Sequence, residues 1–211
     1  MALLTALVAT TILMALGLSV ALLGTADVTL AAHDHEARGL TSASHAAATM
    51  AVADLHALPS WSALIAAGLT ADTSASPGRF VDSTLTPAAP WGGAPLDLRA
   101  LTMRLQAQSD AVASLGGDAP IWRLFEYGPV DRLVPGVRRT SSYYLVVWVA
   151  DDRADGDGDA STDSNGVVVL RAAALGWGSG RIDTEVSVFR QPAAAAGAPD
   201  SFRILTIRPG H

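Results

Sequence analysis

The sequence predicts an α+β fold in which one long N-terminal α-helix packs on a C-terminal antiparallel β-sheet. Two observations support this prediction. Apolar and small residues recur at about 3.6-residue spacing up to residue 58, which is the period of an α-helix. From residue 121 onward the period changes to two, which is typical of strands. We therefore divide the chain into an N-terminal helix and a globular part, residues 59–211, with its sheet over residues 121–208.

The first 26 residues carry no charged side chain, and the first charge is that of Asp27. About 20 apolar residues in a helix cross a hydrocarbon core of about 30 Å, so this segment is long enough to span a membrane. A secretory signal begins with Lys or Arg, whereas the first basic residue here is Arg38. We interpret residues 1–26 as the transmembrane or filament-core half of the helix, in a mature chain whose positive leader has been removed.

Residues 27–58 form the amphipathic half of the same predicted helix. Their apolar stripe is rich in Ala and lacks a sustained a/d heptad, which disfavours a coiled coil and favours packing flat on a sheet. Pro59 is expected to end the helix. The residues expected to contact the sheet are Leu40, Ala47, Met50, Ala51 and Leu55.

Residues 59–120 are rich in turn signals and contain one further predicted helix. It runs from Asp97, the expected N-cap, to about Leu115. Its expected apolar face consists of Leu98, Leu101, Leu105 and Val112.

Five predicted strands follow, and their short connections predict an antiparallel meander. The segment GWGSG at 176–180 predicts a hairpin between the third and fourth strands. Trp122 and Trp148 fall in strands and are expected in the core under the long helix, whereas Trp61, Trp91 and Trp177 fall in turns and are candidates for exposed contacts. The strands are IWRLFEYG (121–128), SSYYLVVWVA (141–150), GVVVLRAAAL (166–175), RIDTEVSVFR (181–190) and SFRILTIR (201–208).

Composition excludes several classes of function. The chain has no cysteine, so it has no disulfide, no thiolate metal site and no c-type haem attachment. Its net charge of -6 gives no support for nucleic acid as a partner. No nucleophile elbow, phosphate-binding loop or zinc-protease motif is present, so we do not expect an enzyme.

The acidic segment DDRADGDGDASTDSNG, residues 151–166, resembles half of a calcium-binding loop. Alternating carboxylates at positions 1, 3 and 5, with a fourth at position 9, converge on one ion in such loops, although the glycine of position 6 and the glutamate of position 12 are missing here. The alternative is a solvated acidic loop that holds no ion. The predicted Ca²⁺ ligands are Asp155, Asp157, Asp159 and Asp163.

A helix with an apolar first half and an amphipathic second half, followed by an antiparallel sheet, resembles a type IV pilin. The closest likeness is to PilX-like minor pilins and related pseudopilins. In the helix it rests on MALLTALVATTILMALGLSVAL and GLTSASHAAATMAVADL. In the sheet it rests on IWRLFEYGPVDRL, SSYYLVVWVADD and VVVLRAAALG.

This resemblance implies a structural subunit of a type IV pilus or related pseudopilus, with other pilin or pseudopilin subunits as partners. It implies the bacterial inner membrane before assembly and an extracellular filament afterwards. It also implies that a peptidase removes a leader, which makes Met1 the mature N-terminus. Major pilins carry Glu at the fifth position, where this chain has Thr5, so a minor or tip subunit is implied. The alternative is a single-pass anchored extracytoplasmic binding domain that does not polymerise.

Overall fold

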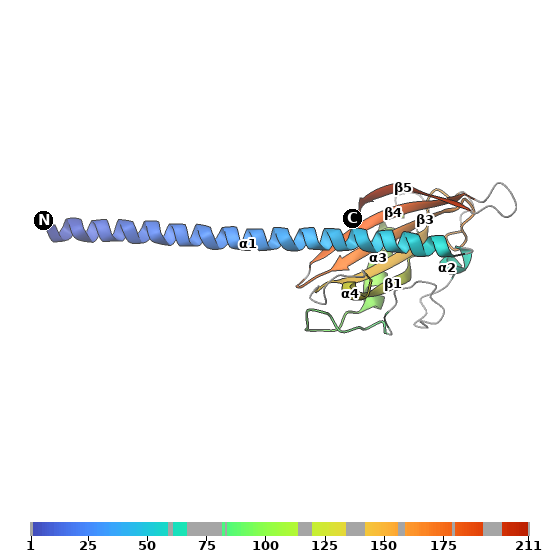
Figure 1. Cartoon of the computed structure of the whole chain (residues 1–211), viewed down its shortest axis with the longest axis horizontal. Helices are drawn as coiled ribbons and strands as arrows, with labels where there is room; N and C mark the ends of the chain where they lie inside the picture. Colours follow the sequence, from blue (N-terminus) through green and yellow to red (C-terminus); the bar gives the residue numbers. More distant parts are fainter. Residues whose placement is uncertain are drawn as a thin grey trace. The chain divides into compact units, whose positions relative to one another are not determined.

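The computed structural model describes residues 2–58, 61–66, 82, 84–113, 120–133, 142–155, 159–178, 180–191 and 200–210. The chain divides into two compact units, Met1–Gly39 and Leu40–His211, and each is described by itself. Figure 1 gives the order of elements along the chain. They are α1 (Ala2–Ala57), α2 (Ser62–Ala66), α3 (Leu98–Ala113), β1 (Arg123–Pro129), α4 (Val130–Leu133), β2 (Tyr144–Asp151), β3 (Val167–Leu175), β4 (Arg181–Gln191) and β5 (Ser201–Pro209).

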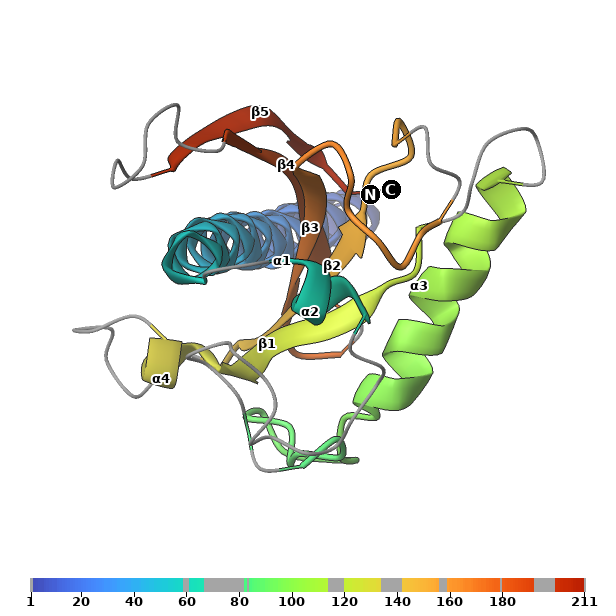
Figure 2. The ribbon, with the colours of Figure 1, turned by 90° about the vertical axis from the view of Figure 1, so that its right-hand side faces the viewer.

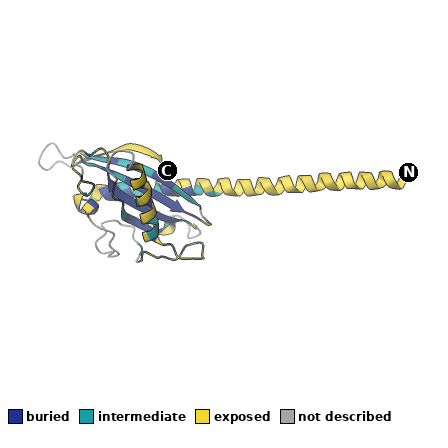
Figure 3. Ribbon diagram, turned by 180° about the vertical axis from the view of Figure 1, so that it is seen from behind, coloured by how far each residue is buried: buried dark blue, intermediate teal, exposed yellow. Residues whose placement is uncertain are grey.

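Helix α1 confirms the predicted long helix and contributes 56 residues. In the first unit every described residue from 2 to 35 is exposed (Figure 3). In the second unit α1 buries a stripe of small and apolar side chains at helical spacing. The predicted contacts Leu40, Ala47, Ala51 and Leu55 are buried, and Met50 packs against the same core. Pro59, the expected helix terminator, lies outside the described residues.

The five strands form one antiparallel sheet in the order β1-β2-β3-β4-β5, so the predicted meander is confirmed. The β3–β4 turn falls where GWGSG predicted a hairpin. There the N–H of Gly176 donates to the carbonyl of Gly180 at 2.8 Å, and Gly178 has a φ of 70° that favours glycine.

Both faces of the sheet are covered, as Figure 2 shows. Strand β2 is buried along its whole length, and its side chains alternate between two cores. Leu145, Val147 and Val149 share one core with α1 from Leu40 to Leu55, whereas Val146 and Trp148 share the other with α3. The α+β fold class is therefore confirmed. The sequence predicted helix α3 but not that it covers the second face of the sheet.

Helix α3 begins as predicted. The side chain of Asp97 accepts a hydrogen bond from the N–H of Ala100 at 2.8 Å, which is the geometry of an N-cap. Leu98 and Leu105 are buried against the sheet. Val112, in the last turn of α3, is 51% exposed, so its assignment to the apolar face was wrong.

Two expectations about tryptophan need correction. Trp148 is buried, but beneath α3 rather than beneath the long helix, because the alternation along β2 turns it to the opposite face. Its indole N–H donates to Thr102 of α3 at 2.8 Å, and that of Trp122 donates to Ser109 at 3.1 Å. Trp61 is not an exposed contact, since it is 2% exposed and donates to the carbonyl of Leu55 at 3.1 Å.

Trp177 is 71% exposed, as expected for a residue in a turn. Trp91 is partly buried and packs against the core beneath α3.

Candidate functional site

The N-terminal part of α1 is long and apolar enough to cross a membrane. Its most apolar 18-residue window has a mean hydropathy of 2.3, and none of that window is buried within the chain. The few hydroxyls in this segment are satisfied by its own backbone: Thr10 and Thr11 donate to carbonyls three and four residues earlier, and Ser19 donates to Ala15 at 2.8 Å. A helix in hydrocarbon has no water to hydrogen-bond its polar groups, so these groups must bond within the helix, as they do here.

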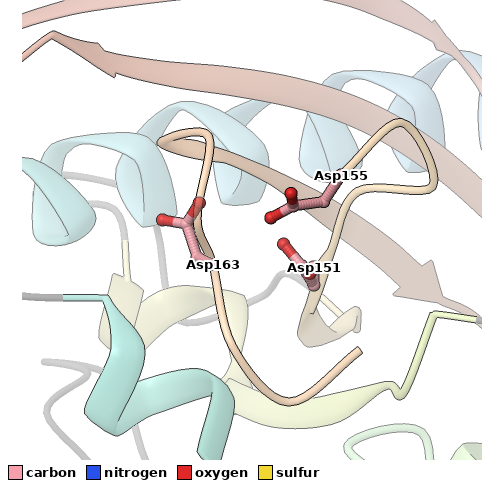
Figure 4. Close-up of side chains that lie close together, drawn as sticks. All are labelled: Asp151, Asp155 and Asp163. Carbon is pink, nitrogen blue, oxygen red and sulfur yellow. The ribbon is translucent and has the colours of Figure 1, made fainter. Parts of the chain in front are cut away.

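A second candidate site lies in the connection between β2 and β3. Three carboxylates, those of Asp151, Asp155 and Asp163, each present an oxygen within 4.8 Å of the other two. Figure 4 shows the three side chains close together, with Asp151 at the end of β2, Asp155 in the turn after it and Asp163 in the segment before β3; the carboxylates of Asp151 and Asp155 point toward one another. We call this group the carboxylate cluster.

The sheet fixes both ends of the connection that carries the cluster. Asp151 ends β2 and pairs with Val168 of β3. Just before β3, Gly166 has a φ of 76°, and a Cβ at this position would lie 2.7 Å from the carbonyl oxygen of Arg190. That close approach explains why glycine occupies the position at which a calcium loop would carry its last glutamate.

Asp151 is the unusual member of the cluster. It is 2% exposed, and its Oδ1 atom has no hydrogen-bond partner among the described residues. The pKa of Asp151 is raised to about 7, chiefly because burial desolvates the carboxylate. One backbone hydrogen bond lowers this pKa, and the negative charges of Asp155, Asp163 and Asp152 contribute to raising it. Within the described part of the chain, this buried carboxylate therefore has no hydrogen-bond donor for its Oδ1 atom.

The other two carboxylates are oriented by the loop itself. The Oδ2 atom of Asp155 accepts the N–H of Ser164 at 2.7 Å, and its Oδ1 accepts the hydroxyl of the same residue. The Oδ1 atom of Asp163 accepts the N–H of Gly166 at 2.7 Å. Burial raises the pKa of Asp163, and the charge of Asp155 adds to that effect. Both side chains are therefore held in place rather than free to turn into solvent.

The structure brings together two of the four predicted calcium ligands, Asp155 and Asp163. Asp159 is exposed and outside the carboxylate cluster; it accepts hydrogen bonds from Ser161 and Thr162, which lower its pKa. Asp157 lies outside the described residues. Asp151 was not among the predicted ligands, although its position directly after an apolar strand was a signal that a carboxylate could be buried there.

The surroundings of Asp151 are open on one side. A cavity of about 740 Å³ is bordered by Asp151, Arg153 and Trp122. Within it, the guanidinium of Arg153 donates to the hydroxyl of Ser109 on α3 at 3.3 Å. Of the three cluster residues, Asp151 alone borders this cavity. The carboxylates of the cluster offer the hard oxygen ligands that divalent cations such as Ca²⁺ prefer.

Comparison with protein-family models, with curated proteins and with solved structures finds no match to this chain.

Proposed function

We propose that this chain is a structural subunit, minor or at the tip, of a type IV pilus or related pseudopilus. It would be held in the bacterial inner membrane through the N-terminal part of α1 and would pass from there into an extracellular filament. Its partners would be other pilin or pseudopilin subunits, which contact it through the same apolar helical segment.

One observation supports this proposal above the others: the first part of α1 is apolar, uncharged through Ala26 and unburied, whereas residues 40–57 are built into the core of the sheet. An apolar helix that no described residue of its own chain covers is expected to need an apolar environment from outside. Bilayer and a helical bundle both supply one, and small residues such as Gly17 and Ala21 permit close helix approach. The assignment to a minor or tip subunit rests only on the resemblance to type IV pilins, because this chain has Thr5 where major pilins carry Glu.

The test compares two variants of one residue in cells that express the chain. Leu16→Asp places a charge in the apolar segment and should abolish recovery of the chain in filaments sheared from the cell surface, because an unpaired charge in an apolar bundle is costly. Leu16→Met preserves volume and apolarity and should assemble normally. Recovery of Leu16→Asp in filaments at the wild-type level would contradict the proposal.

Direct contact with partners can be tested by a single introduced cysteine, because the chain has none of its own. Apart from the neighbouring backbone of the helix itself, no heavy atom of the described residues lies within 4 Å of a Cβ added at Gly17, so Gly17→Cys should leave the helix intact. Oxidative crosslinks from this position to another pilin-like chain would support assembly through the helix. A wild-type chain found only in the membrane fraction, with no crosslinked partner, would favour the single-pass anchored binding domain.

A further inference from the structure

We infer that the carboxylate cluster of Asp151, Asp155 and Asp163 is a calcium site in which the buried Asp151 is the decisive ligand. This ligand set differs from the one that the spacing of the sequence predicts, since it begins at the end of β2 and excludes Asp159. The inference does not depend on the proposed role in a filament.

The first step is the unpartnered oxygen of Asp151. A buried polar atom without a hydrogen bond costs free energy, and a buried charge costs more. Folded proteins seldom retain such a group unless a partner is supplied from elsewhere. Here the oxygen belongs to a carboxylate that lies within 4.8 Å of an oxygen of each of two others and faces Asp155 in Figure 4, so a cation bound among the three would satisfy it.

The second step is the fixed geometry of the other two ligands. Donors from Ser164 and Gly166 hold the carboxylates of Asp155 and Asp163 in orientations that bring one oxygen of each toward Asp151. Like charges at this separation repel even at an effective dielectric of about 20. An arrangement that holds three carboxylates this close together is favourable when a bound cation offsets their repulsion.

The third step is the identity of the ion. All three ligands are hard carboxylate oxygens, which suit Ca²⁺ and Mg²⁺ rather than softer metals. Two oxygens on opposite sides of Ca²⁺ lie about 4.6–5.2 Å apart. Three oxygens within 4.8 Å of one another therefore fit around one Ca²⁺. Mg²⁺ demands a stricter octahedral shell at about 2.1 Å and gives up its waters reluctantly, so we expect it to bind this cluster more weakly than Ca²⁺.

A bound ion would join the end of β2 to the segment that leads into β3. The register pair Asp151–Val168 lies next to it, so the ion would close the open end of this strand pair. Removal of the ion would leave the repulsion of the cluster to act on the same end of the sheet.

The experiment is a calcium titration of the full chain in detergent, by calorimetry, with Mg²⁺ as a comparison. The wild-type chain should bind one Ca²⁺ and bind Mg²⁺ at least about tenfold more weakly. Asp151→Asn should lose at least about tenfold in calcium affinity. Asp159→Asn makes the same change of charge on the same loop but outside the cluster, and it should keep the wild-type affinity.

Thermal unfolding provides a second readout that a purely structural role for Asp151 would not produce. In chelator, Asp151→Asn should melt at or above the wild-type temperature, because the amide removes the buried charge. In calcium the order should reverse, because only the wild-type chain gains stability from binding. Absence of saturable calcium binding would overturn the inference. So would equal binding by Asp151→Asn and wild type, or an equal loss in Asp159→Asn.

Discussion

The two halves of α1 share one helical backbone and have opposite surroundings. In the first half, Leu3 is 85% exposed and Leu16 is 58% exposed; in the second half, Ala47 and Leu55 are fully buried. Both halves are rich in apolar residues, so composition alone does not separate them. The difference is that the second half packs on the sheet of the same chain, whereas none of the residues that the structure describes covers the first half.

The arrangement of side chains around the helix explains this difference. The second half carries a narrow stripe of small residues on one side and polar residues such as His45 and Thr49 elsewhere, as expected for a helix that packs on one surface. The first half is apolar on all sides through Ala26. A helix that is apolar all round is either buried in protein or surrounded by lipid.

The largest expected difference in stability comes from introducing a charged residue into each half of α1. Ala47→Asp places a carboxylate against the sheet with no partner and should destabilise the globular part by about 3–5 kcal/mol, enough to unfold it or nearly so. Leu16→Asp should leave the melting temperature of the globular part unchanged. All five tryptophans lie at residue 61 or later, so fluorescence melting of the full chain in detergent reports on that part alone. Equal melting temperatures for both variants would contradict the comparison.

The next largest difference in stability is expected when a leucine side chain is truncated to alanine in each half of α1. Leu55→Ala should cost about 2–5 kcal/mol, because it leaves a cavity between α1 and the sheet. Leu16→Ala changes an exposed side chain and should fall within about 0.5 kcal/mol of wild type. Urea unfolding followed by tryptophan fluorescence measures both. A loss of more than about 1 kcal/mol for Leu16→Ala would show that the first half also supports the globular part.

Much of this fold was predictable from the sequence, because each element carries a local signal. The change of period from 3.6 to two separated α1 from the sheet, and Asp97 marked the start of α3. The face of the sheet on which each side chain lies was harder to predict from the sequence. Trp148 and Val149 are neighbours in an apolar strand, and only the presence of α3 on the second face shows that Trp148 belongs there.

The carboxylate cluster was predicted in part for a similar reason. Spacing within the loop selected Asp155 and Asp163 correctly as neighbours, because that pattern is local. It did not select Asp151, whose place in the cluster depends on the pairing of β2 with β3. The spacing also included Asp159, whose carboxylate instead accepts hydrogen bonds from Ser161 and Thr162.

A smaller effect concerns pH, and it also separates the two regions. Residues 2–26 contain no titratable side chain, so any pH dependence of stability comes from the remainder of the chain. The pKa of Asp151 is raised from 3.8 to about 7 in the folded state. The folded chain therefore holds a proton that the unfolded chain releases, and stability in chelator should fall as pH rises from about 4 to about 7. The effect should be smaller than that of Leu55→Ala, because opening of the loop relieves part of the repulsion.

Urea midpoints between pH 5 and pH 8 in chelator measure this slope, and Asp151→Asn should flatten it. Asp159→Asn is the matched control, since the pKa of Asp159 is lowered and its protonation falls below this range. Stability that rises with pH over the same interval would contradict the assignment of the raised pKa to Asp151.

The smallest effect compares a serine in each half of α1. The hydroxyl of Ser44 is buried and shares a hydrogen bond of 2.8 Å with Thr184 of β4, whereas Ser19 donates to the backbone of its own helix in an exposed position. Ser44→Ala leaves the hydroxyl of Thr184 buried without this partner and should cost about 1–3 kcal/mol. Ser19→Ala should be neutral within about 0.5 kcal/mol. Adding Thr184→Val to Ser44→Ala should recover part of the loss, because the second change removes the orphaned hydroxyl, and a double-mutant cycle by urea unfolding measures the coupling. Additive losses would show that the pair does not tie α1 to the sheet, and that apolar packing alone distinguishes the second half of the helix from the first.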